Sequence, residues 1–220
     1  MPVVPSEPGA VVGRKGCGPH DLRHAVLDGS DPSCLRANVR SEIQRGFGHV
    51  VPTGLDHILF VLGVFLMTRK WKPLVLQIST FTVAHTLTLW LASAGYVKLP
   101  ANIVEPIIAA SIVVVALENV FFKNYTHWRL LIVFAFGLIH GLGFAGAMAT
   151  RLNSSTSLII GLLGINLGVE FGQLAVISAA LVATCWIRDS EKYRKFVVIR
   201  GSLLIAAMGV WWVIERVSSR

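Results

Sequence analysis

Long apolar segments dominate the chain after residue 48, and six of them are long enough to cross a membrane as helices. They lie at approximately 50–68, 74–95, 103–122, 130–150, 157–187 and 197–216. A spanning helix needs about 20 mainly apolar residues, and each segment comes close to or exceeds this length. The pattern predicts an all-α fold, a polytopic integral membrane bundle of about six transmembrane helices.

The first 48 residues follow a different pattern, because they are polar and rich in Pro, Gly and Asp. They are predicted to form a polar N-terminal tail, 1–48, ahead of a transmembrane domain at 49–220. Within the tail, apolar residues recur every fourth position from Leu35 to Phe47 and charged residues fill the other faces. This spacing predicts a short amphipathic helix at the membrane surface.

Composition agrees with a lipid environment. Of the 220 residues, 54% are hydrophobic and 15% are charged, whereas soluble domains carry about 25% charged residues. A soluble globular enzyme is therefore excluded. The net charge of +8 is accompanied by no nucleic-acid motif, so the expected partner is the lipid bilayer and not nucleic acid.

The basic residues are distributed unevenly between the two ends of the predicted bundle. The loops after the first, third and fifth segments hold nine Lys and Arg, Arg129 among them, against six in the opposite loops, the near tail and the C-terminus, Arg216 among them. Cytoplasmic loops carry the excess of positive charge in membrane proteins. Both termini are therefore predicted to lie outside the cytoplasm.

Ionisable side chains occur at similar depth in four of the predicted spans. They are Asp56 and His57 in the first, His85 in the second, His140 in the fourth and Glu170 in the fifth, with His49 above Asp56 at the outer mouth. A charge at the bilayer centre costs about 2.5–3.5 kcal/mol on insertion scales, so each such group needs a partner or a function. We expect these residues to form a midplane metal site.

The fifth segment shows which of its faces points inward. At 100° per residue, Asn166, Glu170 and Gln173 share one face. Glycines recur every fourth position from Gly164 to Gly172 on the opposite face. The glycine face is typical of close helix packing, and the polar face is predicted to line the site or its pathway.

Two acids of the third segment are interpreted separately. Glu105 has the capping-box spacing from Asn102, and capping and pathway roles are both open for it. Glu118 lies near the cytoplasmic end, where Lys123 or Arg200 are the expected partners of its carboxylate. The functional interpretation of Glu118 is an inner gate or exit site.

Imidazole and carboxylate ligands suit divalent nickel, cobalt, zinc or iron, whereas Ca²⁺ and Mg²⁺ prefer oxygen alone. A midplane site of this kind predicts a permease for which the metal ion is the substrate. One alternative is an intramembrane metal-dependent hydrolase that uses the same His/Asp cluster. Another is a non-catalytic membrane accessory subunit with a structural metal. Assembly into a homo-oligomer is left open.

From Gly46 to Gln173 the sequence resembles the HupE/UreJ family, particularly its second, UreJ-like subgroup. The motifs that carry the resemblance are GFGHVVPTGLDHILFVLG, TFTVAHTLTLWLASAG, VEPIIAASIVVVALEN, FGLIHGLGFAGAM and INLGVEFGQLAV. The resemblance implies a polytopic bacterial inner-membrane protein associated with nickel or cobalt uptake. It implies metal-site roles for His49, Asp56, His57 and His140.

In the family's better-understood branch, the first motif has a His followed after five residues by Asp-His, whereas six residues separate His49 from Asp56 here. The later His-Gly pair is His140-Gly141, and the acid on the following span is Glu170.

Overall fold

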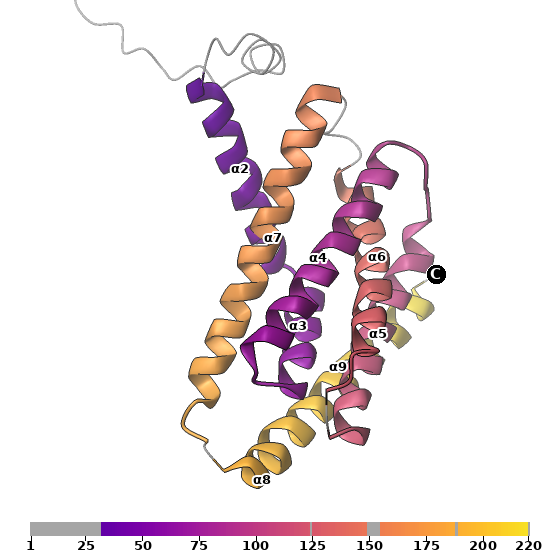
Figure 1. Ribbon diagram of the computed structural model, residues 1–220. Coiled ribbons are helices and arrows are strands. Elements are labelled where there is room, and N and C mark those ends of the chain that lie inside the picture. The colour runs from indigo at the N-terminus through magenta and orange to yellow at the C-terminus, as the bar shows by residue number, and fades with distance from the viewer. Residues whose placement is uncertain (1–31, 124, 149–154, 188, 220) are drawn as a thin grey trace, which may run out of the picture.

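The computed structural model describes residues 32–123, 125–148, 155–187 and 189–219, and its regular structure is helical (Figure 1). The helices are α2 (Pro32–Val50), α3 (Leu55–Met67), α4 (Trp71–Ser93), α5 (Ala101–Phe121), α6 (Arg129–Met148), α7 (Ser155–Thr184), α8 (Ser190–Lys192), the π-helix η1 (Tyr193–Ile199) and α9 (Arg200–Ser218). The predicted all-α fold is confirmed.

Several helices are suited to cross a membrane. Within the described residues, α4, α5, the part of α7 from Gly161 to Thr184, and η1 with α9 are long and apolar enough to span. The bent pair α2 and α3 adds a fifth candidate span, and the apolar part of α6, Arg129–Phe144, is shorter. The chain is therefore an integral membrane protein with four or five long spans, and the described residues of each predicted apolar segment are mainly helical.

The chain is broken near the start of the first predicted segment, 50–68. Val39–Val50 and Leu55–Met67 meet at an angle of 72° across a four-residue break. Pro52 lies in this break, where it has no backbone N–H to continue a helix and disfavours the helical conformation of the residue before it. The helix that precedes the break, α2, runs continuously through the expected boundary between the tail and the transmembrane domain.

The most extensive helix contacts join α2 to α7, α4 to α6, and α5 to α9. Glycines permit the first two. A Cβ at Gly164 or Gly168 would overlap α2, and a Cβ at Gly137 or Gly141 would overlap α4. The predicted glycine face of the fifth segment is thus a packing face. Its partner is the helix that was expected at the membrane surface.

Replacing a glycine of this face is expected to destabilise the protein. In Gly168→Ala the new methyl group would overlap the Ile43 carbonyl oxygen and the Phe47 backbone nitrogen. We expect a loss of about 1–3 kcal/mol in unfolding free energy, as for other overpacked positions. Gly48→Ala is the matched control, since in the described part of the chain no atom beyond its chain neighbours and its own helix backbone lies within 4 Å of its new methyl group. Unfolding in mixed micelles should show no loss for Gly48→Ala; equal losses in both variants would contradict this packing.

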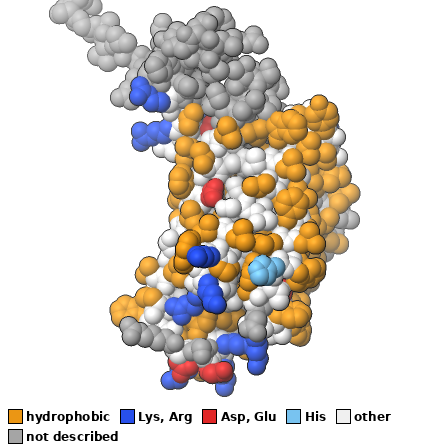
Figure 2. Space-filling view, in the orientation of Figure 1, with side chains coloured by type: hydrophobic (Ala, Val, Ile, Leu, Met, Phe, Trp, Pro, Cys, Tyr) orange, Lys and Arg blue, Asp and Glu red, His pale blue; other side chains and the backbone are white. Residues whose placement is uncertain are grey.

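The outer surface of the bundle is apolar, as Figure 2 shows for one face. Val83, Leu131 and Leu204 are exposed by 64%, 65% and 72%. Contiguous apolar surface of this kind is rare on soluble monomers and is typical of contact with lipid.

Candidate metal centre

The break between α2 and α3 brings two histidines together. His49 lies in the last turn of α2 and His57 in the first turn of α3, and their ring centroids are 4.8 Å apart. Because the C-terminal end of a helix carries partial negative charge, the end of α2 favours a cation beside His49. The bend thus creates a contact that a straight helix would not make.

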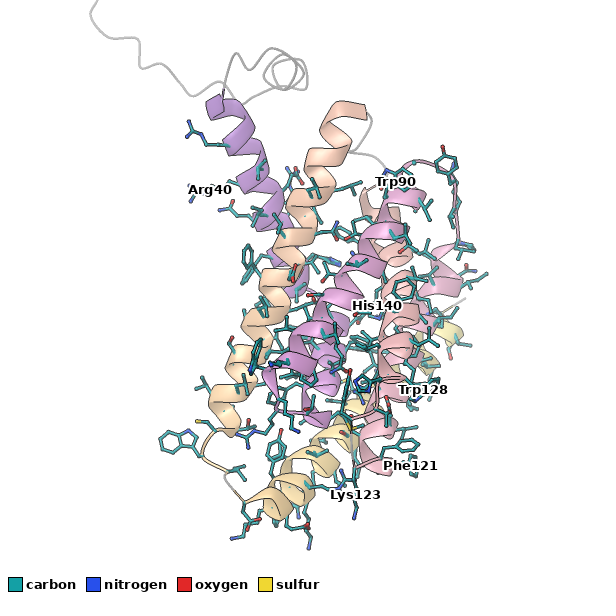
Figure 3. All side chains as sticks on the ribbon, viewed as in Figure 1. Arg40, Trp90, Phe121, Lys123, Trp128 and His140 are labelled. Carbon is teal, nitrogen blue, oxygen red and sulfur yellow. The ribbon has the colours of Figure 1, made fainter. Side chains whose placement is uncertain are left out.

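Two further helices contribute histidines from the other side. The His57 ring centroid lies 5.9 Å from that of His85 in α4 and 5.0 Å from that of His140 in α6. His57, His85 and His140 are 5%, 0% and 1% exposed, and His140 is labelled at the centre of the bundle in Figure 3. One donor nitrogen from each of His49, His57 and His85 lies within 4.8 Å of the other two. We call these four residues the histidine cluster.

Each member of the histidine cluster has a buried nitrogen without a hydrogen-bond partner among the described residues. These atoms are Nε2 of His49, His57 and His85, and Nδ1 of His140. Buried polar atoms are nearly always paired, because an unpaired one costs about 1–3 kcal/mol. Four such atoms on neighbouring rings indicate a site for a ligand that accepts nitrogen lone pairs.

Asn166 fixes the tautomer of His85. Its Nδ2 donates to the Leu162 carbonyl oxygen at 2.7 Å, so its Oδ1 is the atom that faces His85, 3.4 Å from Nδ1. An amide oxygen only accepts hydrogen bonds, so Nδ1 of His85 carries the proton. The lone pair of His85 is therefore on Nε2, the unpaired atom of the cluster.

Ser111 of α5 fixes His140 in the same way. Its hydroxyl donates to the Ile108 carbonyl oxygen at 2.7 Å and lies 3.1 Å from His140 Nε2. Because the hydroxyl proton is already used, Nε2 of His140 donates to Ser111 and the lone pair is on Nδ1. Ser111 was not among the predicted site residues, although it is the one hydroxyl residue of the segment 103–122.

A pocket of about 490 Å³ leads to the cluster from the end of the bundle where α5 begins and α9 finishes. His49, His57 and His140 line this pocket. Asp56 and Glu105 line it as well, so carboxylates stand at the approach to the histidines. Phe144 covers His49, with ring centroids 3.9 Å apart.

Asp56 does not join the close group of donors. Its carboxylate forms an ion pair with Arg216 at 2.9 Å, and Arg216 also donates to the Glu105 carbonyl oxygen at 2.9 Å. Successive helical residues point about 100° apart, so Asp56 and His57 face different neighbours. Arg216, counted from the sequence among the charges of the loops and the C-terminus, thus pairs with Asp56, which was predicted to lie in the metal site.

The polar face of α7, predicted to line the site or its pathway, contacts α4. Besides Asn166, Gln173 accepts from Thr82 at 3.2 Å and Glu170 accepts from Ser79 at 3.4 Å. The three donors of the close group are all imidazoles, so Glu170 is not one of them. The side chains of Glu170 and Gln173 therefore lie at the contact between α7 and α4.

Aromatic rings close the opposite side of the cluster. Phe60 follows His57 by three residues in α3, and Phe81 precedes His85 by four residues in α4. Because α3 and α4 run in opposite directions (Figure 1), both offsets lead toward the end near α8. The centroids of Phe60 and Phe81 are 5.1 Å apart, and both residues are 1% exposed.

A buried ion pair lies beyond these rings. Arg129, 0% exposed, pairs with Glu118 at 3.0 Å and donates to Gln77 at 2.9 Å, to Asn119 at 3.2 Å and to the Gly63 carbonyl oxygen at 3.2 Å. The expected partners of Glu118, Lys123 and Arg200, are not the ones found. Arg129, counted as a loop charge from the sequence, is an interior residue.

The donor set fits a metal ion. Ligands at about 2.1 Å from a tetrahedral ion lie roughly 3.4 Å from one another. The nitrogens of His49, His57 and His85 are within 4.8 Å, so a shift on the order of 1 Å would close them on an ion. His140 adds a fourth imidazole next to His57.

A sequence profile of the family described as HupE / UreJ protein matches residues 29–216. This range begins just before α2, ends within α9, and includes every member of the histidine cluster. No curated protein and no solved structure matches the chain.

Proposed function

The chain belongs to the HupE/UreJ family, and on that premise we propose that it is a membrane permease for a divalent transition-metal ion, nickel or a related ion. The observation that carries the proposal is the set of four unpaired, buried imidazole nitrogens. His49, His57 and His85 bind the ion, and His140 completes the set. Asn166 and Ser111 hold two of these rings in the ligating tautomer.

The ligand type selects the class of ion. Imidazole nitrogen suits nickel, cobalt, zinc and iron in their divalent states, whereas Ca²⁺ and Mg²⁺ require oxygen ligands. Asp56 and Glu105, on the approach, supply negative charge that attracts a cation into the pocket. These two acids at the entrance attract the ion, and the histidines bind it.

Access from one side supports transport over a closed structural site. The pocket reaches the histidines from one end, while Phe60 and Phe81 and then the Arg129–Glu118 pair separate them from the other. An ion bound there would have entered from one side and would leave only after the bundle rearranges, as in alternating access. Glu118 is the acid on the exit side.

The pairing of the helices supports the same mechanism. If the spanning units are numbered along the chain, with α2 and α3 as the first, the main contacts join units 1 and 5, 2 and 4, and 3 and 6. If unit 1 is exchanged with unit 4, unit 2 with unit 5 and unit 3 with unit 6, the same three pairs of units are in contact. The exchanged units run in opposite directions (Figure 1). Inverted repeats of transporters produce this relation, with the binding site at their interface.

The distribution of charge supports an orientation. Lys and Arg gather at the end of the bundle near α8, the lower end in Figure 2. If this end is cytoplasmic, by the positive-inside rule, both termini lie outside the cytoplasm of a bacterial inner membrane. The metal pocket then opens to the extracytoplasmic side, and import is the expected direction.

Removing a tautomer-fixing partner should weaken metal binding while the ligands remain. Ser111→Ala is expected to lower metal affinity by about 10–100-fold, the usual effect of losing a partner behind a ligating histidine. Thr80→Ala is the control, because its hydroxyl bonds to the Leu76 carbonyl oxygen on its own helix. Calorimetric titration of purified protein with Ni²⁺ measures both, and equal affinities in the two variants would reject the role given to Ser111.

The proposed function is tested by flux. Purified protein in proteoliposomes should carry Ni²⁺, Co²⁺ or Zn²⁺ across the bilayer with saturation, and should not carry Ca²⁺ or Mg²⁺. His140→Ala should abolish this flux while the protein still inserts. Retention of one non-exchangeable metal ion per chain without flux would reject the permease and favour the hydrolase or the accessory subunit.

A further inference from the structure

A second pocket, of about 870 Å³, lies at the end of the bundle opposite the metal pocket. Its charged lining consists of four cations, Arg69, Lys70, Lys123 and Arg194, and one acid, Glu191. The lining residues come from the end of α3, the loop between α3 and α4, the start of α4, the loop between α5 and α6, and from α8 and η1. We call it the basic pocket. Its excess of positive charge is suited to an anion.

Two tyrosines line the basic pocket with unused hydroxyl groups. The hydroxyl oxygens of Tyr125 and Tyr193 are buried and have no hydrogen-bond partner in the described part of the chain. Tyr193 is 8% exposed as a whole residue. Burial raises the pKa of the Tyr125 hydroxyl, so this group stays protonated and able to donate at neutral pH. Unused donors beside cations favour a ligand that is both anionic and rich in acceptors.

Of the four cations, the two arginines are held in place by hydrogen bonds, and the two lysines are exposed. Arg69 donates to the carbonyl oxygens of Thr184 and Ile187, and Arg194 donates to those of Val120 and Phe122. These bonds hold the arginines at the ends of α7 and α5.

Lys70 and Lys123 are exposed, and their ammonium groups have no ion pair among the described residues. The lysines are therefore free to contact a ligand.

The basic pocket lies at the level of exposed aromatic residues. Trp71 follows Lys70 directly and is 68% exposed, and Phe122 precedes Lys123 and is 59% exposed. Figure 3 shows Lys123 near Phe121 and Trp128 at the same end of the bundle. Aromatic residues mark the boundary between lipid and water. The pocket thus opens where lipid headgroups and cytosolic anions are both within reach.

We propose that the basic pocket binds a phosphate group, either of an anionic lipid headgroup or of a free phosphate. Lys70 and Lys123 contact its charge, and the hydroxyls of Tyr125 and Tyr193 donate to its oxygens. Basic pockets between transmembrane helices on the cytoplasmic side are suited to headgroups of this kind. The site is independent of the histidine cluster, so its test does not depend on metal transport.

The test is native mass spectrometry of the detergent-purified chain, titrated with phosphatidylglycerol, with zwitterionic phosphatidylcholine, and with inorganic phosphate. The wild type should retain phosphatidylglycerol with at least about tenfold preference over phosphatidylcholine. If inorganic phosphate at millimolar concentration does not displace the lipid, the source is the headgroup. If phosphate binds and displaces it, the proposal holds with free phosphate as the ligand. Retention of neither anion overturns it.

Three variants distinguish binding at a specific site from nonspecific attraction by surface charge. Lys70→Gln/Lys123→Gln should weaken binding about thirtyfold, from two cations each contributing near the surface. The control Lys72→Gln/Lys195→Gln changes the same charge at the same end, outside the pocket lining, and should have little effect. Tyr193→Phe removes no charge and should still weaken binding about tenfold. Equal losses in both lysine pairs, or full binding by Tyr193→Phe, would overturn the proposal.

Discussion

His57→Ala should reduce the affinity for Ni²⁺ by more than about 100-fold, because loss of a direct ligand exceeds the 10–100-fold loss that follows removal of its supporting partners. His57 is the residue whose ring lies next to those of the three other histidines, at centroid distances of 4.8, 5.9 and 5.0 Å. Its removal therefore breaks the cluster at its centre. Equilibrium dialysis with metal analysis of the purified protein measures the loss.

His127→Ala is the matched control for this result. His127 is exposed and lies before α6 at the other end of the bundle from the metal pocket. It should keep the wild-type affinity. A loss of metal binding in His127→Ala, or none in His57→Ala, would contradict the assignment of the site.

Arg129→Ala should cause the largest loss of stability, about 3–5 kcal/mol, as expected when one partner of a buried ion pair is removed. The substitution would leave the Glu118 carboxylate buried beside acceptor atoms of Gln77 and Asn119 that lose their donor. Unfolding of the purified protein in mixed micelles measures this difference in free energy.

The double variant Glu118→Met/Arg129→Met distinguishes an ion pair from simple packing. With both charges gone no carboxylate is left unpaired, so the part of the loss that comes from the Glu118 charge should return, while the Gln77 and Asn119 oxygens still lack the Arg129 donor. Lys195→Ala, at an exposed position of η1, should change stability by no more than about 0.5 kcal/mol. If the double variant is no more stable than Arg129→Ala, the charge of Glu118 does not explain the loss.

Apolar length and helical periodicity predicted much of the fold. Both are local properties of the chain, so the six apolar segments and the two faces of α7 could be read without knowing what packs against them. The polar face of α7 was placed toward the interior because Asn166, Glu170 and Gln173 share it, and they bond to His85, Ser79 and Thr82 of α4.

The path of the chain around the break could not be predicted from periodicity. Placing His49 directly above Asp56 assumed a straight helix, whereas the chain bends by 72°. The signal was present in Pro52 and Gly54, which are typical of a helix interruption. Because of the bend, the ring of His49 contacts that of His57, and Asp56 forms an ion pair with Arg216.

Charge partners were the least predictable feature. A basic residue at the end of an apolar segment is usually exposed, and Arg129 and Arg216 were counted as such. Their partners, Glu118 and Asp56, come from other helices, and sequence spacing does not give the rotation of one helix against another. Which acid meets which base is decided by tertiary packing.

The central claim, that the histidine cluster holds a divalent transition-metal ion, is tested most directly by X-ray absorption at the nickel edge of the loaded protein. The spectrum should show at least three imidazole nitrogens at about 2.1 Å, by analogy with other metal–imidazole sites, and one fewer in His57→Ala. A first shell of oxygen alone, or a spectrum unchanged in His57→Ala, would contradict the claim.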